Sequence, residues 1–131
     1  MATVPLIEYD DASPEVRQMY DELREARQTE YINNFWKALA NQPTTLKRLW
    51  SSLNEVMAPG ELDAVTKQMI YIAVSVANGC EYCIHSHTAA ATGLGMTPGQ
   101  YEELLAVIGI AHETNGLASA MQVPVDDNYL K

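Results

Sequence analysis

The chain has 131 residues, with 8 Lys plus Arg against 17 Asp plus Glu, so its formal net charge at pH 7 is −9. Hydrophobic residues make up 47% of it. That is enough for a buried core without disulfide or metal staples, so we expect one domain over residues 1–131 and exclude disordered and fibrous classes. The acidic balance argues against nucleic acid and membrane surfaces as partners. The sequence shows no signal segment, and its longest apolar tract, residues 69–77, is too short to cross a bilayer, so we expect a cytoplasmic protein.

Helical periodicity dominates the first half of the chain. Apolar residues recur at three- and four-residue spacing and no alternating pattern persists, so the predicted fold class is all-α, a multihelical bundle. Ser13-Pro14-Glu15 is a strong helix start, because Ser caps orphan amides and Pro tolerates the first position. A short helix over residues 35–40 follows, and a third helix stops at Pro59-Gly60. The predicted inward faces carry Val16, Met19, Tyr20, Leu23 and Ala26 in the first helix, and Leu46, Leu49, Trp50, Leu53, Val56 and Met57 in the third.

The second half is also predicted to be helical. A fourth helix is expected to be capped by Asp63 and to run over residues 64–77, and from Met69 onward it is apolar nearly all round. Such a helix belongs at the centre of the bundle or in a subunit interface. Asn78-Gly79 supplies a left-handed stop. The helices predicted after it are a fifth from about Cys80 to Thr92, a sixth beginning at the capping box Thr97-Pro98-Gly99-Gln100, and a weaker seventh over residues 111–121, which makes six to seven in all.

The segment from Cys80 to His87 gathers both cysteines of the sequence at one helix start. A helix N-terminus lowers the pKa of a cysteine, because its N–H groups and positive dipole end stabilise the thiolate. Cys80 and Cys83 are three residues apart and can share one helical face, so they can cycle between dithiol and disulfide. His87 lies four residues after Cys83, on the same face, where it can take or return a thiol proton, whereas His85 points elsewhere.

These residues resemble the carboxymuconolactone decarboxylase and alkylhydroperoxidase D family. The resemblance implies an all-helical bundle in a homo-oligomer, trimeric or hexameric in relatives, with no dissociable cofactor. It is nearly full length. It rests on Asn78-Gly79-Cys80-Glu81-Tyr82-Cys83 followed by His87, on the apolar helix before this motif, on Thr88-Ala89-Ala90-Ala91 after it, and on Ser13-Pro14-Glu15-Val16 leading to Asn33-Asn34-Phe35.

The peroxidase branch of that family assigns a role to each residue of the motif. There the second cysteine attacks a hydroperoxide, the first resolves the product as a disulfide, and the following histidine belongs to a proton relay. By resemblance these roles fall on Cys83, Cys80 and His87. The function expected from the resemblance is therefore a thiol-dependent peroxidase, which reduces a hydroperoxide and accepts electrons from a lipoylated protein, a thioredoxin-like protein or a small thiol.

Two positions depart from the peroxidase pattern, and a third residue bears on the thiols. The glutamate that this branch places twelve residues before the first cysteine is Gln68 here, and the histidine before the second cysteine is Tyr82. Neither side chain is a general base near neutral pH, although both can orient a partner by hydrogen bonds. Glu81 adds a negative charge that opposes thiolate formation at Cys80. We therefore expect dithiol chemistry with slower peroxide turnover, unless a carboxylate from elsewhere, such as Glu55 or Glu61, approaches.

Other readings of the same residues stay open. The cysteine pair with His87 offers three ligands to a zinc ion that prefers four, so no protein-only metal site is predicted. A second interpretation is that the two cysteines are packed, reduced thiols with no chemical role. A lyase of the carboxymuconolactone decarboxylase branch would need a basic pocket for an anionic substrate, and a non-catalytic oligomer that binds a metal or an apolar ligand is a further alternative. The clustered basic residues available to a lyase are Lys37, Lys47, Arg48 and Lys67.

Overall fold

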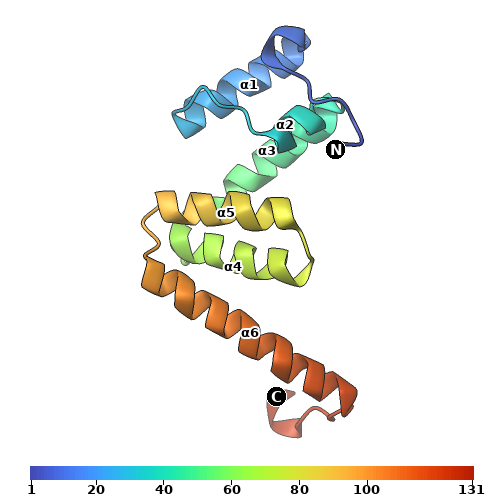
Figure 1. Ribbon diagram of the computed structural model, residues 1–131, viewed down its shortest axis with the longest axis vertical. Helices are drawn as coiled ribbons and strands as arrows, with labels where there is room; N and C mark the ends of the chain where they lie inside the picture. The colour runs from blue at the N-terminus through green and yellow to red at the C-terminus, as the bar shows by residue number, and fades with distance from the viewer. The chain divides into compact units, whose positions relative to one another are not determined.

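The computed structural model describes residues 1–131 and contains six α-helices and no strand (Figure 1). The predicted all-α fold class is therefore confirmed. None of the helices is both long enough and apolar enough to span a membrane. The helices are α1 (Pro14–Arg27), α2 (Asn34–Leu39), α3 (Pro43–Met57), α4 (Ala64–Ala77), α5 (Glu81–Gly93) and α6 (Pro98–Ala120), with short 3-10 helices η1 (Tyr9–Asp11) and η2 (Asp127–Tyr129).

The helix starts follow the capping residues that the sequence predicts. The side chain of Ser13 accepts a hydrogen bond from the amide of Val16 at 3.3 Å, and α1 begins at the next residue. Asp63 caps α4 by accepting from the Thr66 amide at 2.8 Å, and this bond holds the pKa of its carboxyl below the usual value. Thr97 and Gln100 form the expected capping box at the start of α6.

The last helix differs from the prediction. α6 is one continuous helix of 23 residues, and it includes the segment that was expected to form a separate, weaker helix. Asn115 and Gly116 lie inside it without breaking it. An interior glycine costs a helix only about 1 kcal/mol relative to alanine, and no proline interrupts the ladder, so the stop signal was too weak.

The chain divides into two compact units, Met1–Ala58 and Pro59–Lys131. In the first unit α3 packs against α1 and α2. The rings of Trp36 and Trp50 meet edge to face, with centroids 5.5 Å apart, at the centre of its core. Tyr20 is fully buried, and its hydroxyl donates to the carbonyl oxygen of Ile7 at 2.8 Å. Burial raises the pKa of Tyr20 to about 12, with a smaller contribution from the charge of Glu8.

The buried faces of this unit are shorter than the sequence predicts. Four of the five residues expected to be buried on α1 are buried, but Ala26 is exposed, so the buried stripe ends at Leu23. On α3 only Leu46 and Trp50 are buried, and Val56 is 64% exposed. The helical period was therefore right, while the length of the covered face was overestimated.

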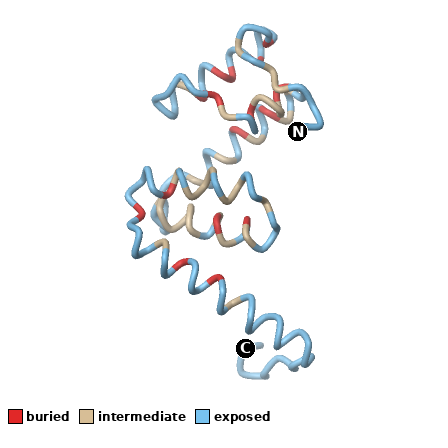
Figure 2. The backbone as a smooth tube through the Cα atoms, viewed as in Figure 1, coloured by how far each residue is buried: buried red, intermediate tan, exposed pale blue.

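In the second unit α4 and α5 lie side by side and antiparallel, and α6 contacts α4 (Figure 1). The buried positions of α6 fall in its first half, whereas every residue from His112 onward is exposed (Figure 2). One face of α4 is also uncovered, since Ile70 is 49% and Val74 is 53% exposed. This uncovered apolar face fits the second of the two positions expected for α4, a subunit interface, which stays a prediction. The buried core consists of Ile72, Ala91, Met96, Leu104 and Ile108.

Candidate redox site

The turn between α4 and α5 places the first cysteine. Gly79 adopts φ +66°, a left-handed conformation that glycine reaches at little cost. Its amide donates to Val76 O at 3.1 Å, and the amide of Cys80 donates to Ser75 O at 2.9 Å. These two bonds form a Schellman motif, which satisfies the last carbonyls of α4. The predicted stop at Gly79 is confirmed, and it turns the chain so that Cys80 becomes the N-cap of α5.

Cys80 and Cys83 form a disulfide with their Cα atoms 5.3 Å apart. Both residues are half-buried. The amide of Cys83 donates to Cys80 Sγ at 3.3 Å, in the way that an N-cap side chain accepts from the first turn. When the pair is reduced, the same N–H group and the positive end of α5 stabilise negative charge on a sulfur at this position. The shared face that the spacing predicts is therefore present.

His87 lies one turn further along α5 and is held from α4. Its Nδ1 is 2.7 Å from Oε1 of Gln68. An amide oxygen can only accept, so the hydrogen in this bond is on Nδ1 and the lone pair of the neutral ring is on Nε2. Gln68 thus orients the ring and selects its tautomer. It is not a proton acceptor as a glutamate would be.

A residue that sequence reasoning missed also contacts His87. The ring of Tyr71 stacks on the imidazole with ring centroids 3.6 Å apart and planes inclined by 21°. Tyr71 follows Gln68 by three residues on α4, so the two side chains lie on the same face of that helix. That spacing was the available signal, but it does not reveal which residue of α5 faces the pair.

The remaining candidates are exposed side chains. Glu81 is exposed at the start of α5, Tyr82 is 42% exposed and His85 is exposed. Glu61, a possible substitute carboxylate, is exposed before α4, and Glu55 is exposed on α3 of the other unit. No group of three or more His, Cys, Asp and Glu side chains is arranged to hold a metal ion.

The basic residues considered for a lyase site fall in both units, with Lys67 on α4 of the second. Lys37 Nζ is bound to both carboxylate oxygens of Glu8, at 2.9 and 2.8 Å, so its charge is already balanced. Lys47 and Arg48 are exposed on α3.

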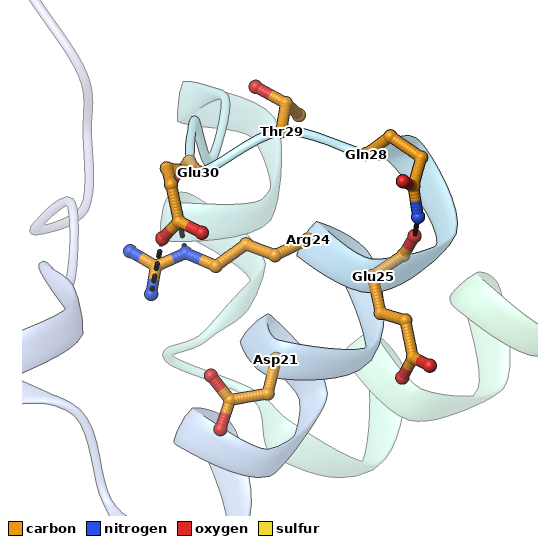
Figure 3. A pocket seen from close by; sticks show the side chains of 6 residues that line it. All are labelled: Asp21, Arg24, Glu25, Gln28, Thr29 and Glu30. Carbon is orange, nitrogen blue, oxygen red and sulfur yellow. Dashed lines mark hydrogen bonds and ion pairs between the residues drawn. The ribbon is translucent and has the colours of Figure 1, made fainter.

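An open depression lies beside the C-terminal end of α1 (Figure 3). Arg24 crosses it and binds Glu30, with a hydrogen bond of 3.0 Å to the backbone oxygen and an ion pair of 3.6 Å to the carboxylate. The Gln28 side chain donates to Glu25 O at 2.8 Å. This depression is lined by no thiol or imidazole, and its one basic residue, Arg24, is paired with Glu30. The only constellation suited to redox chemistry is therefore the one at the start of α5.

Fold and site together define an all-helical protein with a vicinal cysteine pair and an oriented histidine. A family model described as the carboxymuconolactone decarboxylase family matches residues 43–126, so the chain belongs to that family. The crystal structure of the alkylhydroperoxidase AhpD core from Rhodospirillum rubrum is similar, with 50% sequence identity, coverage of 100% of this chain and 98% of that one, and a TM-score of 0.96. An uncharacterised protein of Cupriavidus necator is 31% identical over 77 residues, which cover 58% of this chain and 68% of that protein. The family resemblance noted in the sequence and the alkylhydroperoxidase D fold are thereby confirmed.

Proposed function

We propose that the protein is a thiol-dependent peroxidase of the alkylhydroperoxidase D type. The observation that carries the proposal is the Cys80–Cys83 disulfide at the N-terminus of α5, one helical turn before an imidazole that Gln68 orients. Such a pair stores and releases two electrons, and an adjacent base supplies the proton transfers that peroxide reduction needs. The name of the 50% identical relative, an alkylhydroperoxidase, supports the same chemistry.

The proposed reaction starts from the dithiol. His87 Nε2 takes the proton of Cys83, and the thiolate attacks one oxygen of a hydroperoxide, ROOH. The O–O bond breaks, the imidazolium returns the proton to the departing alkoxide, and ROH and a sulfenic acid on Cys83 result. The thiol of Cys80 then attacks the Cys83 sulfur. The S–O bond breaks, the thiol proton leaves with the hydroxide as water, and the disulfide forms.

The disulfide returns to the dithiol through an external dithiol donor. One thiolate of the donor attacks a sulfur of the pair, and its second thiol displaces the mixed disulfide, so the donor is oxidised by two electrons and both cysteines are reduced. A lipoylated protein, a thioredoxin-like protein or a small dithiol meets this chemical requirement. No separate cofactor takes part in this scheme.

In the proposal, Gln68 limits the rate of peroxide reduction. A neutral amide orients His87 but adds no negative charge to support the imidazolium that forms during proton transfer, and hydrogen bonds to charged groups are roughly twice as strong as neutral ones. Glu81 and Tyr82 are exposed beside the pair. In the proposal the charge of Glu81 opposes thiolate formation at Cys80, and Tyr82 orients a partner by a hydrogen bond. We therefore expect peroxide turnover with a slower chemical step than a carboxylate partner would allow.

The proposed working form is a homo-oligomer, a trimer or a hexamer. The second unit presents a run of exposed apolar side chains, and large uncovered apolar faces are typical of protein interfaces. Sedimentation velocity should show an assembly that Val74→Asp dissociates, because a carboxylate would then enter an apolar contact. A monomeric wild-type protein at micromolar concentration would contradict this part of the proposal. The exposed apolar side chains of α4 and α6 are Ile70, Val74, Leu105, Val107, Ile110 and Leu117.

The deciding experiment is a free-thiol count on the reduced protein before and after one equivalent of an organic hydroperoxide, followed in time. Loss of two thiols in seconds to minutes, restored by a dithiol, is the expected result. Cys83→Ser should consume no peroxide, whereas Cys80→Ser should stop at a sulfenic acid that a dimedone probe traps. Thiols that persist for hours in the wild-type protein would overturn the proposal, and the reverse behaviour of the two variants would exchange the cysteine roles.

A further inference from the structure

We infer that Tyr71 is a positioning residue for His87 and sets the plane in which the imidazole exchanges its proton. The inference rests on the proposed function. Its structural basis is the stack between the two rings, 3.6 Å between centroids and 21° between planes, within one unit of the chain. This separation is shorter than the 4.5–7 Å usual for aromatic pairs, so the two faces lie in close contact.

Two residues of α4 contact His87, and each restricts a different motion of its ring. The bond from Nδ1 to Gln68, at 2.7 Å, selects the tautomer and fixes one end of the ring. A single hydrogen bond still allows the imidazole to swing about the bond axis, and Nε2 would swing with it. The face of Tyr71 removes that freedom, because a tilt of the ring would drive imidazole atoms into the phenol ring. The two contacts together therefore restrict the direction of Nε2 more than either contact does alone.

The neutral partner at position 68 makes the stack more important. A carboxylate would bind the imidazolium through a charge-assisted bond, and that bond alone would hold the ring more firmly. The amide of Gln68 makes a neutral bond of ordinary strength. The orientation of His87 must then depend to a larger extent on packing, and Tyr71 is the aromatic side chain that packs on it.

The same stretch of α4 also fixes the backbone of the cysteine turn. Ser75 is 3% exposed, and its hydroxyl donates to Tyr71 O at 2.7 Å. Its own carbonyl accepts from the Cys80 amide at 2.9 Å. Tyr71 thus belongs to a rigid, hydrogen-bonded segment that contacts the histidine through its ring and leads to the first cysteine through Ser75. This placement suits a residue that keeps the imidazole of His87 in a constant position relative to the cysteine pair.

The test combines nuclear magnetic resonance with single-turnover kinetics on the reduced full-length protein. In the wild-type protein, nitrogen-15 shifts of His87 should show the Nδ1–H tautomer, and its ring protons should be shifted upfield by the Tyr71 ring. Tyr71→Phe keeps the aromatic face and should preserve both signals and the rate of thiol oxidation by cumene hydroperoxide. Tyr71→Leu should lose the upfield shift and react about two- to tenfold more slowly, the range that a stacked aromatic pair contributes.

Tyr101→Leu provides the matched control. Tyr101 is a partly buried tyrosine on α6 that packs against the core of the same unit. Its replacement should lower stability while the His87 signals and the oxidation rate stay unchanged. If Tyr101→Leu moves them as strongly as Tyr71→Leu does, general loosening of the unit explains both and the inference is overturned.

The outcomes separate this inference from the proposed function. If the wild-type thiols do not react with peroxide, the proposed function fails, and the ring-proton shifts of His87 still decide whether Tyr71 orients it. Absence of the upfield shift in the wild-type protein would overturn the inference without any substitution, so a poorly folded Tyr71→Leu variant does not leave it undecided. A wild-type rate of thiol oxidation in a folded Tyr71→Leu variant would overturn it as well.

Discussion

Replacement of Gln68 by Leu tests whether its bond to His87 contributes to the reaction. The bond is 2.7 Å long and partly buried, and leucine removes the acceptor for Nδ1–H at a similar side-chain volume. Loss of one partner of a buried hydrogen bond costs about 1–3 kcal/mol. If that energy is fully expressed in the transition state, it slows thiol oxidation by about 5- to 150-fold, because each 1.36 kcal/mol is tenfold in rate. The Gln68→Leu variant should therefore fold, because the side-chain volume is similar, and its thiols should be oxidised much more slowly than those of the wild-type protein.

Gln68→Glu tests the same contact in the opposite direction. The carboxylate would accept from Nδ1–H and stabilise the imidazolium during proton transfer, so oxidation should accelerate by about tenfold, within the range of general acid–base effects. The measurement is stopped-flow mixing of the reduced protein with excess cumene hydroperoxide and quenching with a thiol reagent. Gln18→Leu, at an exposed glutamine on α1, is the control and should react like the wild-type protein. A folded Gln68→Leu variant at wild-type rate, or a Gln68→Glu variant slower than wild type, would refute the reasoning.

Three further predictions concern the scaffold. Gly79→Ala should lower the free energy of unfolding by about 1–2 kcal/mol in urea titrations, purely through the left-handed φ of +66°, because an added Cβ meets nothing within 4 Å; a smaller loss in Gly79→Asn would agree. Ile72→Ala, at a fully buried side chain, should cost about 2–5 kcal/mol, and a loss below 1 kcal/mol would contradict the core assignment. Tyr20→Phe should cost about 1 kcal/mol at pH 7 through the lost bond to Ile7 O. Because burial raises the pKa of Tyr20 from 10.0 to about 12, its stabilisation is complete below pH 10 and is lost as the pH rises towards 12, so the deficit of Tyr20→Phe should shrink in that window.

Local chemistry made most of the helix boundaries predictable. Ser13, Asp63 and Thr97 cap helices within three residues of their own position, and the turn at Gly79 ends α4 through bonds that span three and five residues. Such interactions depend on residue type and spacing alone, so the sequence contains them in full. The disulfide pairing is local for the same reason, since Cys80 and Cys83 share one helical turn.

Tertiary packing decided the rest of the site and the extent of the core. Gln68 and His87 are nineteen residues apart on different helices, and the stack of Tyr71 on His87 likewise crosses from α4 to α5. The sequence determined which face of each helix these residues occupy. Only the packing of α4 against α5 decided which residues meet, because a contact between helices depends on their separation, their rotation about their own axes and the rotamers that fit between them.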